Sequence, residues 1–557
     1  MLAFLSAPIF ADNPATPTAA QWREDLAYLV DMLERVHPNL YARIDREIFA
    51  DEARAIHEEI PELSPVEITV RLMQLVALVQ DGHTSLEPLD PAGFGRWFPV
   101  RFYRFSDGIF VTAVAAEHGT AAGARVTRIG SLPAEEAWQR TATLRGSDNA
   151  FGSANSAAFY LSSAAALRAL GVNDSEEVLE IEVQRAGSDP ETVRLEAIDT
   201  GYNLDWQFWG EIWGPGSESV EYVTGVDSLP SESFRDPESD LPLHLRNRTA
   251  YWFTYDEKTK LFYLQINFLG DSRSETFADF HARLWKAVDE AEIDLFVLDI
   301  RYNIGGNGDL VKRFVHEFIK RDEINRAGTL YTIVGRTTFS AGVMMAAAMD
   351  RHTETVFVGE PMGAYYKHYG DGTSFRLPHS GLRVWCSTIY HQLDAYVGDR
   401  EVMSIQLPAP FSSADYFGKR DPALDAILAS RERPPLAQLF REQGAEPALE
   451  AYRQQLAEYD GVSWWAPFTM RELDGLGDEL REAGKWEDAL AAYQLNIERH
   501  PDQWLPWHSL GHAYQKQGKF DQALESYERA LEIDPYNNLA PFQREAIEEL
   551  RQQKQGG

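Results

Sequence analysis

Cysteine and basic residues are scarce in this chain, and each shortage excludes a class of site or partner. Cys386 is the one cysteine among 557 residues, so neither an intramolecular disulfide nor a cysteine-based zinc site can form. It lies in the strand-like stretch "LRVWCST", where we expect it to be buried. Lysine and arginine total 52 against 86 acidic residues, a formal charge of −34 at pH 7. Such a surface repels phosphate groups, which argues against nucleic acid and anionic membranes as partners.

Long hydrophobic runs are also missing, apart from one at the start. No later stretch approaches the roughly 20 apolar residues that span a bilayer, so no membrane span is expected. The chain begins "MLAFLSAPIFADNPATPTAA", and the apolar run ends at Ala11. This run suits the hydrophobic part of a signal peptide that lacks its basic start. Residues 1–11 therefore predict a signal-peptide remnant and a periplasmic or secreted protein; the alternative is an apolar tail with no such role.

The composition is that of a globular protein, with 44% hydrophobic residues in a chain long enough for three or four domains. Leucine and valine at three- and four-residue spacing after Trp22 place one apolar stripe on a helix and predict a helical region over 20–90. From 95 to 200, alternating stretches separated by turn residues predict a β-rich module. It is expected to contain one hairpin over 96–114, a second over 177–198, and a helix in "PAEEAWQRT".

Two further segments follow the β-rich module. Apolar strands alternate with amphipathic helices from 248 to 432, which predicts a largely parallel sheet covered on both faces. Before it, residues 201–247 are rich in aromatic, glycine and acidic residues and predict a connecting segment. Three tryptophans of this segment either pack against the protein or line a groove: Trp206, Trp209 and Trp213.

The last part of the chain contains a repeat. "GKWEDALAAYQLNIERHPDQW" begins at Gly484 and "GKFDQALESYERALEIDPYNN" at Gly518, 34 residues later. This is the period of tetratricopeptide repeats, which pair helices through small residues and end them at proline. Residues 465–550 therefore predict an α-helical tetratricopeptide segment that either binds a protein partner or buttresses the core.

A glycine-rich turn follows one of the buried strands, in "LFVLDIRYNIGGNGDL". Gly305 and Gly306 permit positive φ angles and close approach to the backbone. The stretch lacks the Gly-Lys-Ser/Thr of a phosphate-binding loop and the spacing of a dinucleotide fingerprint. A turn that presents backbone N–H groups fits an oxyanion hole instead. We expect Asp299 and Arg301 to pair and fix this turn.

A second unusual turn lies in "TIVGRTTFSAG", where an apolar strand is followed by a hydroxyl and small residues. Ser340 either caps the next helix or is a nucleophile. A nucleophilic serine also needs a base. His83, in the polar turn "VQDGHTSL" after an apolar helix, is a candidate, although a loop histidine is equally compatible with a structural role. Asp81 beside it is expected to shape the turn.

Four stretches, in this order, resemble the tail-specific (C-terminal processing) serine peptidases: "DGHT", "VLDIRYNIGGN", "VGRTTFSAG" and "VGEPMGAYYKHYGDGTSFRLPHSGLRV". The likeness is greater to the histidine-containing branch, with its tricorn-core-like and retinoid-binding-protein-like members, and covers roughly residues 22–430. It implies an α/β fold with a crotonase/ClpP-like catalytic core, an N-terminal helical region and a β-rich, PDZ-like module. Here that fold would be joined to the C-terminal tetratricopeptide helices.

The resemblance also implies roles for single residues. Ser340 matches the nucleophile, and His83 matches the general base of the histidine-containing branch. The backbone N–H of Ala341, with that of Gly305 or Gly306, matches the oxyanion hole. The resemblance implies neither a metal nor an organic cofactor.

Two parts of the site stay open. Members of the family with a serine–lysine dyad carry a lysine in a Gly-Lys-Gly that "GEPMGAYYKHYG" lacks, so Lys367 is either an alternative base or an exposed loop cation. A histidine base also needs an acid to orient its second ring nitrogen. The candidates for this acid are Glu360, Asp399 and Glu401.

Three functional hypotheses follow. The leading one is a serine-type peptidase that cleaves polypeptide substrates through an acyl-enzyme. The β-rich module would bind an extended peptide along a strand edge, and the tetratricopeptide helices would hold a protein partner. The second is a catalytically silent ligand- or peptide-binding protein on the same scaffold, and the third is hydrolysis of a non-peptide acyl substrate.

Overall fold

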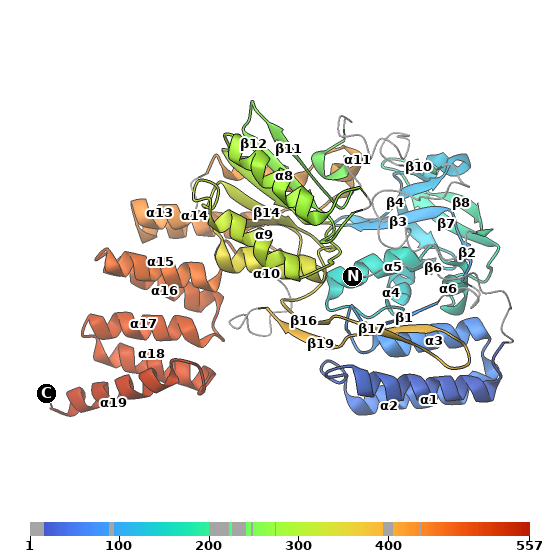
Figure 1. Ribbon diagram of the computed structural model, residues 1–557, viewed down its shortest axis with the longest axis horizontal. Coiled ribbons are helices and arrows are strands. Elements are labelled where there is room, and N and C mark those ends of the chain that lie inside the picture. Colours follow the sequence, from blue (N-terminus) through green and yellow to red (C-terminus); the bar gives the residue numbers. More distant parts are fainter. Residues whose placement is uncertain are drawn as a thin grey trace.

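The computed structural model describes residues 16–88, 94–199, 222–224, 241–246, 249–272, 274–393, 405–433 and 436–556. Figure 1 shows N-terminal helices in blue, a β-rich module in light blue to teal, an α/β core in green to yellow, and a stack of C-terminal helices in orange to red. No helix in these ranges is long and apolar enough to cross a membrane. The signal-peptide remnant at 1–11 and the three tryptophans between 201 and 221 lie outside the described residues, so both interpretations stay predictions.

Three helices form the N-terminal region, as the apolar stripe predicts: α1 (Ala19–Val36), α2 (Arg46–Glu59) and α3 (Pro65–Ala77). Thr18 and Ser64 open α1 and α3 with capping boxes, in which the third helical residue returns the hydrogen bond. α3 buries most of its length and leads through a turn that contains His83 into β1 (Ser85–Glu87).

The β-rich module is a seven-stranded sheet in the order β10-β4-β5-β7-β8, with β3 beside β4 and β6 beside β5. The two hairpins expected from the alternating stretches are confirmed as β3–β4 and β7–β8. The strands are β3 (Val100–Phe105), β4 (Gly108–Ala115), β5 (Arg125–Ile129), β6 (Leu132–Pro133), β7 (Val178–Gln184), β8 (Glu191–Glu196) and β10 (Tyr222–Thr224). A separate short pair joins β2 (Arg96–Trp97) to β9 (Ile198–Asp199).

Helices also belong to this module, and two of them were not predicted. α4 (Ala134–Ala142) was expected, whereas α5 (Ala150–Tyr160) and α6 (Ala164–Ala169) lie where the sequence predicted only strands and turns. Alanine, serine and glycine dominate both helices, so neither shows a clear apolar stripe. They form because small side chains let them pack closely against the module, where Ala164, Ala165 and Ala166 are fully buried.

The α/β core is a six-stranded sheet in the order β11-β12-β13-β14-β15-β20, parallel from β12 onward. Alternate residues face opposite sides: Phe296 and Leu298 pack on the helices α8, α9 and α10, and Val297 packs on α12. The predicted parallel sheet with both faces covered is confirmed. The elements are β11 (Tyr251–Asp256), β12 (Leu261–Ile266), α8 (Phe277–Glu290), β13 (Leu295–Asp299), α9 (Asp309–Ile319), β14 (Leu330–Val334), α10 (Ala341–His352), β15 (Val356–Gly359), β20 (Leu407–Pro408), α11 (Ser413–Phe417) and α12 (Pro422–Ser430).

Four strands between β15 and β20 connect the core to the N-terminal helices. They are β16 (Lys367–Gly370), β17 (Thr373–Arg376), β18 (Arg383–Cys386) and β19 (Ile389–Gln392). β18 lies between β17 and β1, and β16 pairs with β19, so this segment lies beside α3 in Figure 1. Cys386 is fully buried in β18, as expected. Lys367 lies in a strand, so the expectation of a loop cation is wrong in that respect.

The C-terminal helices confirm the repeat. The pairs are α15 (Met470–Glu482) with α16 (Trp486–Arg499), and α17 (Trp504–Lys516) with α18 (Phe520–Ile533). A methyl group at Gly477 would lie 2.4 Å from the ring of Tyr493, and the pair Gly511 and Tyr527 repeats this contact at 3.0 Å. Flanking helices cover the open faces of the two repeats: α13 (Leu436–Gln443), α14 (Ala445–Glu458) and α19 (Ala540–Gly556).

A buried ion-pair network fixes the end of β13. Arg301 contacts Asp299 at 2.8 Å and binds both oxygens of Asp421 at 2.9 Å. Asp421 also caps α12 by accepting the N–H groups of Ala423 and Leu424. The predicted pairing of Asp299 with Arg301 is therefore confirmed, and it ties the glycine-rich turn to a helix more than a hundred residues later.

Loss of Arg301 should destabilise the core strongly. Arg301→Met leaves Asp299 and Asp421 buried without their cation, and we expect a loss of about 3–5 kcal/mol in the free energy of unfolding. The matched control is Arg433→Met, because Arg433 pairs with Glu458 at 2.8 Å on the surface, where both side chains are largely exposed. This control should lose less than about 1 kcal/mol. Urea unfolding followed by tryptophan fluorescence checks both, and equal losses would contradict the expectation.

Candidate functional site

Two turns meet at one edge of the core sheet. β13 and β14 are parallel neighbours, so their carboxyl ends point to the same edge, and each leads into an unusual turn. The N–H of Phe339 donates to the carbonyl of Asn303 at 2.8 Å. A methyl group placed on Gly305 would lie 2.7 Å from Cβ of Ser340. The structure therefore brings together the glycine-rich turn and the serine that the sequence separates by more than thirty residues.

Ser340 has a strained backbone. Its φ is 53° and its ψ is −123°, a combination that residues other than glycine rarely adopt. It occupies the position before the first residue of α10, yet its side chain makes no capping hydrogen bond. Ser340 therefore occupies the N-cap position, but its hydroxyl does not cap the helix. A sharp, strained strand-to-helix turn is the geometry that presents a nucleophilic serine in other hydrolases.

The glycine-rich turn leaves backbone N–H groups available next to Ser340. Gly305 and Gly306 have φ angles of 110° and 125°. A methyl group on Gly306 would lie 2.1 Å from the carbonyl oxygen of Leu269, so the turn packs too closely for a side chain there. The N–H of Gly305 donates to Oδ1 of Asn303 at 2.9 Å. In the part of the chain that the structure describes, no acceptor receives the N–H of Gly306 or of Ala341.

His83 comes from the turn between α3 and β1 and reaches this edge from a different region of the chain. Its ring stacks on that of Phe339, the residue before Ser340, with centroids 4.2 Å apart. Both ring nitrogens are buried without a hydrogen-bond partner among the described residues, and neither bonds Ser340. Burial lowers the pKa of His83 to about 4, against the opposing charge of Asp81. The imidazole is therefore neutral at pH 7 and able to accept a proton.

Asp81 shapes the turn that holds His83, as expected. Four groups contact its buried carboxylate: the N–H of His83 at 2.9 Å, the hydroxyls of Thr84 and Ser387, and Nε2 of His37 at 3.3 Å. Nδ1 of His37 accepts the N–H of Asn39, so Nε2 carries the proton and donates to Asp81. Burial alone would raise the pKa of Asp81, but the contacts with His37, His83 and the hydroxyls outweigh it and the pKa is lowered.

The other predicted site residues lie apart from His83 or outside the described residues. The side chain of Glu360 pairs with Arg336 at 3.3 Å and accepts the N–H of Phe411. Asp399 and Glu401 belong to the part of the chain that the structure does not describe. Successive side chains of a strand point to opposite faces, and the neighbour of Lys367 is the one that stacks towards His83, so Lys367 points away from it.

That neighbour, His368, was not predicted. Its ring centroid lies 5.8 Å from that of His83 and 5.2 Å from that of His391, which forms a row of three imidazoles. Burial, with the neighbouring histidines, lowers the pKa of His368 to about 3, so it adds no charge beside His83 at neutral pH. Only its place beside Lys367 in the sequence could have drawn attention to it.

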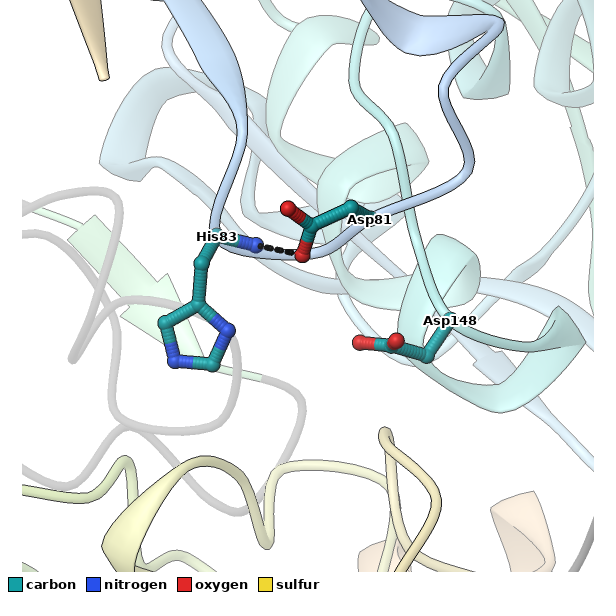
Figure 2. A group of neighbouring side chains, drawn as sticks. All are labelled: Asp81, His83 and Asp148. Carbon is teal, nitrogen blue, oxygen red and sulfur yellow. Dashed lines mark hydrogen bonds between the residues drawn. The ribbon is translucent and has the colours of Figure 1, made fainter. Parts of the chain in front are cut away.

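Asp148 is a second unpredicted neighbour, from the loop before α5. Figure 2 shows it with Asp81 and His83, and each residue offers a ligand atom within 4.8 Å of those of the other two. Oδ1 of Asp148 pairs with Arg43 at 2.9 Å, and Oδ2 accepts the N–H of Gly82 at 3.3 Å. Burial, with the charge of Asp81, raises the pKa of Asp148 to about 7. The spacing is that of metal ligands, but an ion would have to displace Arg43, whose positive charge lies beside the cluster.

The fold matches that of known peptidases. The match with the crystal structure of mature CPAF covers 77% of this chain and 99% of the CPAF chain, with a TM-score of 0.51 and 11% identical residues. This chain has the fold of the tail-specific serine peptidases. The match with the photosystem II D1 C-terminal processing protease covers 70% of this chain and 92% of that protease, with a TM-score of 0.32 and 13% identity.

The C-terminal part has relatives of its own. A match to the tetratricopeptide repeat family covers residues 505–537. The tetratricopeptide repeat domain-containing protein PYG7, chloroplastic, of Arabidopsis thaliana is 25% identical over 126 residues, 23% of this chain and 37% of that protein. The match with RNA polymerase II-associated protein 3 of Mus musculus, 28% identical, spans 17% of this chain and 14% of that protein. This chain thus joins a tail-specific peptidase fold to a tetratricopeptide segment, and it spans well under two thirds of these curated relatives.

The stability of Ser340 variants distinguishes a strained backbone at this position from an ordinary helix cap. We expect Ser340→Gly to be more stable than the wild type by up to about 1 kcal/mol, because glycine adopts the positive φ without strain. Ser340→Ala should stay close to the wild type, since no capping hydrogen bond is lost. A true N-cap serine behaves in the opposite way, with alanine costing about 0.5–2 kcal/mol and glycine gaining nothing. Urea unfolding of the three proteins decides between these two patterns.

Proposed function

We propose that this protein is a serine-type peptidase that acts through an acyl-enzyme. One observation carries the proposal: a strained serine, free backbone N–H groups and a neutral buried histidine from three separate parts of the chain converge at one edge of the sheet. Acyl transfer needs a nucleophile, preorganised donors and a base in this combination. The tail-specific peptidase fold supports the same reading.

In the proposed reaction, His83 accepts the proton of Ser340 as Oγ attacks the carbonyl carbon of a peptide bond. The oxyanion accepts hydrogen bonds from the N–H groups of Ala341 and Gly306, while Gly305, whose N–H is engaged by Asn303, holds the turn. His83 then gives its proton to the leaving amine, and the C–N bond breaks. Water, deprotonated by His83, attacks the acyl carbon of the acyl-enzyme. The bond between this carbon and Oγ of Ser340 then breaks, His83 returns its proton to Oγ, and the new carboxylic acid leaves. These steps use groups of the protein and water.

The stacked position of His83 on Phe339 is compatible with this role. In free enzymes catalytic hydrogen bonds are often long or poorly aligned, and they tighten when substrate binds. The contact already places His83 against the residue that precedes Ser340. The proposed reaction requires a ring nitrogen of His83 to come within hydrogen-bond reach of the Ser340 hydroxyl when substrate binds.

A polypeptide is the proposed substrate. A hollow of about 1370 Å³ extends from Arg43 and Asp148, beside the His83 turn, to Phe468 and Met470 next to the first repeat. Its volume exceeds that of ordinary small-molecule sites. Ser340 and His83 do not line it, so we propose that it holds parts of a chain away from the bond that is cleaved. The repeats are proposed to hold a protein partner or the distal part of the substrate. Export to the periplasm or outside the cell stays a prediction.

Labelling with a fluorophosphonate probe tests the nucleophile and the base, because the probe reacts only with an activated serine. We expect the wild type to be labelled, Ser340→Ala and His83→Ala to lose labelling, and Lys367→Ala to keep it. Lys367→Ala is the matched control, since it removes a neighbouring polar side chain that points away from His83.

The other outcomes are equally informative. Loss of labelling in Lys367→Ala with retention in His83→Ala moves the base to Lys367. A folded wild-type protein that resists the probe, with peptide binding still measurable by calorimetry, contradicts the peptidase and favours the catalytically silent binding protein. Labelling without cleavage of any peptide in a mixed library favours a non-peptide acyl substrate.

A further inference from the structure

We propose that Asp148 is the positioning residue for His83. Its carboxylate accepts a hydrogen bond from the N–H at Nδ1 of the imidazole, which leaves Nε2 unprotonated to receive the proton of Ser340. The inference rests on the proposed function and adds the acid that a histidine base requires. Of the three acids that the sequence suggested, Glu360 is held by Arg336, and Asp399 and Glu401 lie outside the described residues.

Acceptor capacity distinguishes Asp148 from Asp81. An ionised carboxylate offers about four lone-pair sites. Asp81 already receives four donors, three of them on Oδ2, so it has little capacity left for a further N–H. Asp148 receives two, one from Arg43 and one from the backbone of Gly82. Of these two carboxylates, Asp148 therefore keeps more unused lone pairs for a donor on His83.

The geometry agrees with this assignment. Figure 2 shows the ring of His83 with Nδ1 on the side of Asp148 and Nε2 on the opposite side. One ring nitrogen of His83 lies within 4.8 Å of a carboxylate oxygen of Asp148, and Nδ1 has no hydrogen-bond partner among the described residues. A hydrogen bond requires this distance to shorten when a substrate binds, as catalytic contacts do in other enzymes.

The protonation of Asp148 makes the contact sensitive to pH. Burial and the charge of Asp81 raise the pKa of Asp148 to about 7, while Arg43 opposes this rise. The ionised carboxylate accepts the hydrogen bond from Nδ1 more strongly than the protonated acid does. The charged or titratable groups that face His83 are Asp81, Arg145, His391, Asp371 and His368. Of these, His368 is neutral in the same range, and Asp81 has a lowered pKa and stays ionised.

The first experiment compares Asp148→Asn with a matched control. Asparagine keeps the size of the side chain and one of the two oxygen acceptors that Arg43 and Gly82 use, and it removes the charge. We expect the rate of fluorophosphonate labelling at pH 8 to fall at least about 10²-fold. Asp371→Asn removes a more exposed acid that bonds His391 at 2.8 Å, and it should change the rate less than about threefold. Equal losses in the two variants, or a wild-type rate in folded Asp148→Asn, overturn the proposal.

The dependence of the rate on pH separates positioning from a structural role. In the wild type, the labelling rate should rise as the pH passes about 7, where Asp148 loses its proton, and the residual rate below that should vanish near pH 4, where His83 is protonated. Asp148→Asn should lack the step near 7. Arg43→Met should move that step to higher pH, because the guanidinium no longer favours the ionised carboxylate, and should cause no such shift in the Asp148→Asn background. An unchanged step in Arg43→Met and in Asp148→Asn contradicts the proposal.

A measurement that does not depend on catalytic activity tests the contact between Asp148 and His83 independently of the proposed function. In ¹⁵N-histidine spectra, with His83 assigned through its loss in His83→Gln, we expect the proton on Nδ1 above pH 7 in the wild type. Its resonance should be displaced in Asp148→Asn and not in Asp371→Asn. An undisplaced resonance overturns the role of Asp148 whether or not the serine is labelled. If the wild type is not labelled but the resonance is displaced as expected, the peptidase proposal is contradicted and the contact between Asp148 and His83 is still supported.

Discussion

The buried ion pair between Arg301 and the acids Asp299 and Asp421 is the interaction on which the site geometry depends. Charges this deep in a protein are tolerated only when each finds its partner, so the end of β13 and the start of α12 have one favourable arrangement. The glycine-rich turn begins immediately after Arg301. An error in its direction would displace Gly305, which lies so close to Ser340 that even a methyl group would not fit between them.

The strain at Ser340 is maintained by this framework. The hydroxyl of Thr338 donates to the carbonyl of Ile300, and the N–H of Phe339 donates to that of Asn303. These bonds hold the serine turn to the end of β13 from two directions, and α10 fixes its far side. Backbone strain persists only where the surroundings over-determine the conformation. The same bonds keep the glycine-rich turn at a constant distance from the serine, as electrostatic preorganisation requires.

Much of this architecture could be predicted from the sequence, because the spacing of hydrophobic residues and the residue types found in turns are local signals. The parallel core, the N-terminal helices, the repeats and the pairing of Asp299 with Arg301 were all predicted and are confirmed. α5 and α6 were missed because their small residues carry no amphipathic stripe, and tertiary packing alone makes them helical. Asp148, Arg43 and His368 were missed for another reason: each lies in an ordinary local context, and only the approach of distant segments places it beside His83.

The two buried carboxylates beside His83, those of Asp81 and Asp148, have different roles. Like charges this close cannot both be stabilised to the same degree, so the environment separates their pKa values. Asp81, surrounded by donors from four residues, stays ionised and fixes the turn. Asp148 has fewer donors and keeps its proton until about pH 7. The neutral state of His83 is secured far below that pH, so the carboxylate of Asp148, rather than the imidazole, becomes the group whose ionisation near neutral pH controls the proposed reaction.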